Sequence, residues 1–128
     1  MSRRTIAAVS GIYDAIIGVT MLVGRPLLAQ VFNVPLPDPP IHADLNGIFL
    51  LSVAAGYLIP YREPDSAGGR AYLWTMGPLL KGAGAATFVI DHYVRHSPAT
   101  FLLFAASDGA LALITLWALK TRNKPNRF

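Results

Sequence analysis

Three ionisable residues, Asp14, Lys81 and Asp108, lie near the middle of three separate apolar segments. At about 1.5 Å of helix rise per residue, each is expected roughly 14–16 Å from the same membrane boundary, close to the midplane of a hydrocarbon layer about 30 Å thick. A charge at the bilayer centre costs about 2.5–3.5 kcal/mol on insertion scales, so such residues face a bundle interior and pair. The pattern therefore predicts a buried polar centre of two carboxylates and one ammonium.

Three roles for this centre remain open. In the first, Lys81 bridges Asp14 and Asp108 as a structural clamp that sets the helix register. In the second, the centre binds a ligand, a proton or a cofactor, because ionisable residues inside membrane spans mark functional sites. In the third, it contacts a polar group of a partner subunit. The residue types complete no catalytic set, so no catalytic residue is assigned.

A second polar group is expected at the opposite membrane face, where the second apolar segment begins and the third ends. Its members are Asp38, His42, Asp44, Asn46, Asp91, His92 and His96. Histidine and carboxylate side chains are ligands for zinc, copper or non-haem iron, which makes this group a candidate metal cluster. The alternative is ordinary interfacial polarity, with Asp44 complementing the dipole at a helix start. No recognised ligand spacing is complete, so neither a metal nor another cofactor is predicted.

The composition is typical of a membrane protein. Of 128 residues, 53% are apolar and only 14% are charged, whereas a soluble domain averages about 25% charged residues. The chain has room for four spans of about 20 residues and for no soluble domain. The absence of cysteine excludes disulfides, thiolate metal sites and thiol catalysis. The net charge of +4 comes from basic residues at the ends of apolar segments, so no nucleic-acid partner is expected.

We predict an all-α fold, an integral membrane bundle of four antiparallel transmembrane helices that forms a single domain over residues 1–128. The expected spans are residues 5–24, 42–61, 71–92 and 99–119, followed by a cytoplasmic tail over 120–128. Residues 26–32 are too few to span, and they predict a short interfacial helix after the first span. Residues 33–40 contain four prolines and predict a stiff extended connector.

Local features should place Lys81 among closely packed helices. Pro78 cannot donate a hydrogen bond to the Trp74 carbonyl, so it is expected to kink the third helix one turn before Lys81. Small residues follow Lys81 over 82–86 and occur in the second segment over 54–56. Such residues allow helix backbones to approach each other in a membrane.

The distribution of basic residues predicts the orientation. With the N-terminus inside, eight Lys and Arg residues lie on the cytoplasmic side and two, Arg25 and Arg95, lie on the other side. This positive-inside bias places both termini of the multi-pass chain in the cytoplasm.

Several short motifs resemble those of a known group. They are Gly11-Ile12-Tyr13-Asp14 and Gly18 in the first span, Pro26-Leu27-Leu28 after it, Gly47 and Gly56-Tyr57 in the second span, and Leu79-Leu80-Lys81 in the third. In these features and in its layout the chain resembles the DoxX-like small four-transmembrane proteins of the bacterial inner membrane. Some of these look like accessory subunits of respiratory oxidoreductases. The resemblance implies the four-span architecture and a bacterial inner-membrane location.

The sequence is compatible with two functions. The first is a non-catalytic accessory or assembly subunit of a larger inner-membrane complex, respiratory, photosynthetic or oxidoreductase, with membrane lipid and larger subunits as partners. The second is a transporter or membrane enzyme that handles a small molecule, a quinone, a lipid or protons at Asp14, Lys81 and Asp108. Four spans are few for such a role, so this version is expected to form a homo-oligomer. A cavity that reaches Lys81 would discriminate between the two.

Overall fold

The computed structural model describes residues 1–121, which are helical with short connections and contain no strand. The predicted all-α fold is therefore confirmed for this part of the chain, and most of the expected tail, residues 122–128, lies outside the described residues. The elements in chain order are α1 (Arg3–Val23), α2 (Arg25–Phe32), α3 (Ile41–Gly56), α4 (Leu58–Arg62), α5 (Ala67–Trp74), the π-helix η1 (Thr75–Lys81), α6 (Gly82–Arg95), the 3₁₀-helix η2 (Ala99–Phe101) and α7 (Leu102–Lys120).

Three helical stretches are long and apolar enough to cross a membrane. They are Arg3–Val23, Ile41–Arg62 and Ala99–Lys120. The short helix expected after the first of them is α2, and residues 33–40 are not helical, as the four prolines predicted.

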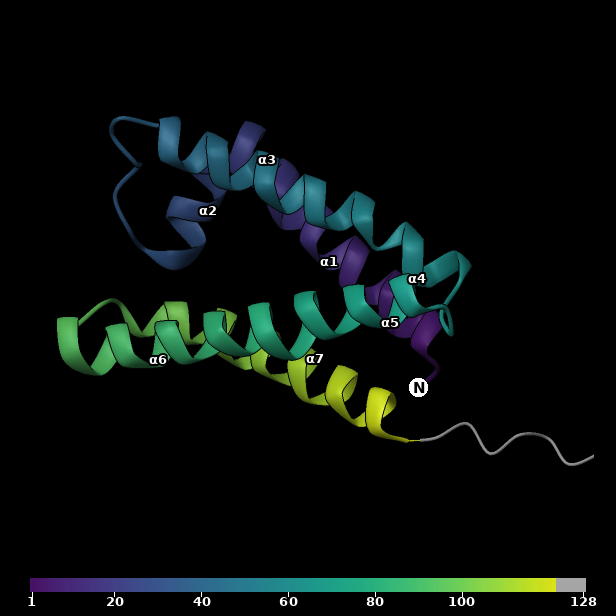
Figure 1. Cartoon of the computed structure of the whole chain (residues 1–128). Coiled ribbons are helices and arrows are strands. Elements are labelled where there is room, and N and C mark those ends of the chain that lie inside the picture. Colours follow the sequence, from purple (N-terminus) through teal and green to yellow (C-terminus); the bar gives the residue numbers. More distant parts are fainter. Residues whose placement is uncertain (122–128) are drawn as a thin grey trace, which may run out of the picture.

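The long helices form two pairs, with α1 against α3 and α6 against α7 (Figure 1). The pairs meet through α1 and α7 and, at one end, through α4 and α5, where the Tyr72 hydroxyl group donates to the carbonyl oxygen of Val53. By contrast, α3 and α6 make at most a marginal contact with each other. Glycine allows the closest approach within the first pair. A Cβ added to Gly18 would lie 2.9 Å from the carbonyl oxygen of Gly47, which is shorter than real side chains allow.

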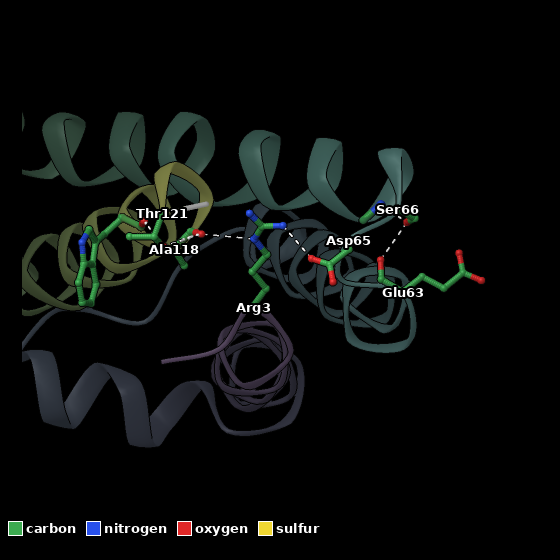
Figure 2. A network of polar contacts seen from close by, with 8 residues as sticks. Arg3, Glu63, Asp65, Ser66, Ala118 and Thr121 are labelled. Atoms are coloured by element: carbon green, nitrogen blue, oxygen red, sulfur yellow. Dashed lines mark hydrogen bonds and ion pairs between the residues drawn. The ribbon is translucent and has the colours of Figure 1, made fainter. Parts of the chain in front are cut away.

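One end of the bundle is held together by Arg3 at the start of α1 (Figure 2). Its Nε donates to the carbonyl oxygen of Ala118 in α7 at 3.3 Å, and its NH1 forms a 2.9 Å ion pair with Asp65 in the turn before α5. The neighbouring Arg4 donates to the carbonyl oxygen of Tyr61 in α4 at 2.9 Å. The start of α1 and the end of α7 therefore lie at the same end of the bundle.

At the other end, α2 joins the two pairs through stacked phenyl rings. Phe32 of α2 is 8% exposed, and its ring centroid lies 4.7 Å from that of Phe104 and 5.7 Å from that of Phe101. Phe88 of α6 also stacks on Phe104, with ring centroids 5.4 Å apart. Thr100 adds a 2.8 Å hydrogen bond to the carbonyl oxygen of Phe32.

Where a kink was expected at Pro78, the structure has the π-helix η1. Backbone dihedral angles stay helical at both of its junctions, so α5, η1 and α6 run on as one helix from Ala67 to Arg95. Because proline has no N–H to donate, a π-helical insertion accommodates the missing bond, and the N–H of Gly82 instead reaches the carbonyl oxygen of Gly77. Lys81, the last residue of η1, faces the bundle interior and is 5% exposed.

Candidate functional site

A buried ion pair between Asp14 of α1 and Lys81 of η1 forms the base of the candidate site. The Lys81 Nζ donates to both carboxylate oxygens of Asp14, at 2.7 and 2.9 Å, and the two side chains are only 5% and 2% exposed. The Tyr13 and Tyr57 rings lie beside the ammonium, with centroids 5.3 and 6.0 Å from Nζ. The charge of Lys81 is therefore compensated locally, and further stabilised by the faces of two aromatic rings.

Asp108 of α7 borders the same site but is not bridged by Lys81. Within residues 1–121, no Lys, Arg or His nitrogen lies within 4.0 Å of its carboxylate. A Cβ added to Gly84 would lie 3.7 Å from its Oδ2. The clamp expected from the sequence, with one lysine between two carboxylates, thus consists of Lys81 and Asp14 only, and both oxygens of Asp14 accept hydrogen bonds from the ammonium.

A cavity of about 390 Å³ connects these groups. Its polar wall consists of Tyr13, Asp14, Asn46, Lys81 and Asp108, and its apolar wall consists of Ile17, Met21, Phe49, Leu50, Leu80, Gly84, Phe88 and Phe104. Tyr13 is positioned by a 2.6 Å hydrogen bond between its hydroxyl group and that of Ser107, the residue before Asp108. Ligand sites of this size are mostly apolar with a few convergent polar groups, which is the composition found here.

The arrangement of the helices indicates where the cavity opens. Its walls come from α1, α3, the helix that contains η1 and α6, and α7. Neighbouring walls pack together on three sides, α1 with α3, α1 with α7, and α7 with α6, whereas α3 and α6 do not close the fourth. The side between α3 and α6 is therefore the one least enclosed by helix packing.

A smaller cavity of about 140 Å³ lies next to the first, under α2 and the proline-rich connector. Ile17, Met21 and Phe104 line both cavities. Its remaining walls are almost entirely apolar and include Phe32 and Phe101. An elongated molecule with its polar end at Lys81 and Asp108 therefore has an apolar space beyond it.

The second candidate group, expected at the outer face, is not assembled into one site. Asp44 pairs with Arg25, Asp91 pairs with Arg95 and accepts a hydrogen bond from Ser97, and His42 is exposed. The Nδ1 of His92 contacts the carbonyl oxygen of Ser97 at 2.7 Å. Among the described residues, no three His, Cys, Asp or Glu side chains come together to hold a metal ion.

The predicted outer-face group does not come together because its members lie on helices that are separated from each other. His42 and Asp44 belong to α3, and Asp91 and His92 belong to α6, the two helices that do not pack against each other. Asp38 is exposed in the connector, and His96 is exposed at the end of α6. Asn46 alone of this group lines the central cavity.

The aromatic wall of the cavity was not predicted from the sequence, although the spacing of its residues along the helices could have indicated it. Phe101, Phe104 and Asp108 recur at i, i+3 and i+7, so they share one face of the last helix. Phe88 lies seven residues after Lys81 and shares its face in the same way.

Comparisons with protein-family models, with curated proteins and with solved structures find no match to this chain.

Proposed function

We propose that the chain is a four-span integral membrane protein, in which the helix Ala67–Arg95 is the fourth span beside the three named above. The contact of Arg3 with Ala118 supports this proposal, because a chain that begins and ends on one side crosses the membrane an even number of times. The two carboxylates and the lysine inside these spans are then paired or face the cavity, as the cost of charge in the hydrocarbon requires.

The exposed surface supports a membrane location. Large apolar side chains point outward along the spans, among them Ile16 on α1 at 62% exposed and Leu113 on α7 at 69%. Eight basic residues on one side against two on the other favour cytoplasmic termini. With the four-span layout of the DoxX-like group, this leads us to assign the protein to the bacterial inner membrane.

The function that the geometry supports best is binding of an amphipathic small molecule. The observation that carries this proposal is the cavity of about 390 Å³, which reaches Lys81 and joins a charged wall to an apolar wall. An entrance between α3 and α6, the side least enclosed by helix packing, would admit a molecule dissolved in the lipid. The role is that of a carrier, a transporter or a membrane enzyme for such a molecule.

The accessory-subunit role is the second candidate, and a different surface favours it. A shallow groove of about 530 Å³ lies along α1, α3 and α4. Its lining combines the large residues Ile12, Leu51, Tyr57, Leu58 and Tyr61 with the small residues Ala7, Ala8, Gly11, Ala15, Ala54 and Ala55. Small residues of this kind allow a helix of another subunit to approach closely in a membrane. Under this role, the Asp14–Lys81 pair acts as a packing device.

Gentle extraction from the source membrane, followed by native mass spectrometry, tests both roles. A bound small molecule, lost in Gly84→Leu, is the expected result, because a leucine at this wall position fills the cavity beside Asp108. The matched control is Gly68→Leu, since nothing lies within 4 Å of a Cβ at Gly68. Recovery with larger subunits and no small molecule would favour the accessory role.

A further inference from the structure

The charges around the cavity restrict the ligand that the proposed function requires. Asp14 and Lys81 compensate each other through two hydrogen bonds, so neither needs a ligand. Asp108 is the remaining carboxyl group of the cavity wall, and no cation of the described chain lies within ion-pair distance of it. The ligand therefore meets a neutral pair on one side and, on the other, a carboxyl group that has no ion-pair partner among the described residues.

On this basis, three kinds of polar head group on a ligand can be compared: an amine, a hydroxyl group and a carboxylate. An amine and the Asp108 carboxyl group share one proton between them, and the pair is neutral overall whichever group carries it. A hydroxyl group can donate a hydrogen bond, but it leaves any negative charge on Asp108 in place. A carboxylate adds a second negative charge beside Asp108, in surroundings where an unpaired charge is costly. The order of preference is amine, then alcohol, then acid.

We propose that the central cavity binds a lipophilic amine, with Asp108 receiving the amino group and the apolar part lying against Phe88 and Phe104. This inference rests on the proposed function and names the chemical class of its ligand. Phe104 lines both this cavity and the smaller apolar one beside it, so a chain or ring beyond the amine has apolar space in the direction of Phe32. Stacked phenyl rings at this wall offer flat faces for such a group.

A matched series of probes tests the ligand class. The probes are 4-phenylbutylamine, 4-phenylbutanol and 4-phenylbutyric acid, which share a phenylalkyl body and differ in the head. Binding to the full-length protein in nanodiscs of zwitterionic lipid is measured by calorimetry, and the signal of empty nanodiscs is subtracted. The wild-type protein is expected to bind the amine most tightly and the acid most weakly.

Asp108→Asn is expected to weaken amine binding at least about tenfold, because a partner of a buried charge pair is lost. Its binding of the alcohol should change little, which also shows that the variant is folded. Asp65→Asn removes the same charge at an exposed position outside the cavity and should leave all three affinities unchanged. An unchanged amine preference in Asp108→Asn would overturn the assignment of Asp108.

The outcomes separate this inference from the proposed function. If the wild type binds the acid as tightly as the amine, and Gly84→Leu abolishes that binding, the amine class is wrong while the ligand cavity stands. If no probe binds to the wild type and extraction recovers no small molecule, both proposals are wrong.

Discussion

Lys81 and Asp14, separated by 67 residues in the sequence, meet through two hydrogen bonds in the interior of the bundle. The contact joins the first helix to the π-helical segment of the third long helix. A buried ion pair adds little net stability over a well-packed apolar pair, whereas loss of one partner leaves an uncompensated charge. The pair therefore specifies which faces of the two helices meet.

Lys81→Met is expected to lower the free energy of unfolding by about 3–5 kcal/mol, because Asp14 loses its partner while remaining buried. The measurement is unfolding by SDS titration in mixed micelles, followed by circular dichroism. Lys120→Met, at the exposed end of α7, is the control and should change stability little.

The double variant Asp14→Asn, Lys81→Met is expected to recover part of that loss, because no unpaired charge remains. Asp108 needs no compensating change, since it is not an ion-pair partner of Lys81. A double variant no more stable than Lys81→Met alone would contradict the pairing seen in the structure.

Gly18→Ala is expected to destabilise the α1–α3 pair by about 1–3 kcal/mol, because its Cβ would meet the backbone of Gly47 at 2.9 Å. Backbone atoms cannot move aside as the end of a side chain can. Gly68→Ala is the matched control, with open space around the added Cβ. Thermal denaturation in detergent compares the two, and equal melting temperatures would argue against the close approach.

Phe32→Ala should cost about 3 kcal/mol of stability, since it removes a buried ring that stacks on Phe101 and Phe104. Val31→Ala, at a neighbouring position that is 57% exposed, is expected to have a small effect. The same SDS titration measures both. A small effect of Phe32→Ala would mean that α2 does not join the two helix pairs.

The orientation can be tested directly because the chain has no cysteine of its own. Val94→Cys, 69% exposed near the end of α6, should react with a membrane-impermeant maleimide in intact spheroplasts. Gly68→Cys, in the first turn of α5, should react only after lysis. The reverse pattern would place the termini outside.

Parts of the fold were predictable because they depend on local sequence. The long apolar segments predicted the helices, and the four prolines over 33–40 predicted the non-helical connector. Pro78 predicted a kink before Lys81, and the structure has a π-helix there. Length, polarity and the missing N–H of proline act within a few residues, so they can be read along the chain.

The site was predictable only in part. Asp14 and Lys81 were expected to be buried because charge is costly among apolar residues, and they are. Their exclusive pairing was not predictable, since at one level of a bundle either carboxylate is within reach of the lysine until the helix rotations are known. His42, Asp44, Asp91 and His92 were predicted to lie together at one membrane face, yet they belong to α3 and α6, which make at most a marginal contact.

The sequence by itself therefore determined the helical fold, the apolar surface and the presence of three charged residues in apolar segments. The tertiary structure decided that Asp14 alone pairs with Lys81, that Asp108 faces a cavity, and that Phe88 and Phe104 form its wall. The physical reason is that hydropathy and backbone chemistry are local properties of the chain. Which helix faces meet depends instead on close contacts between distant residues, such as Gly18 with Gly47 and Phe32 with Phe104.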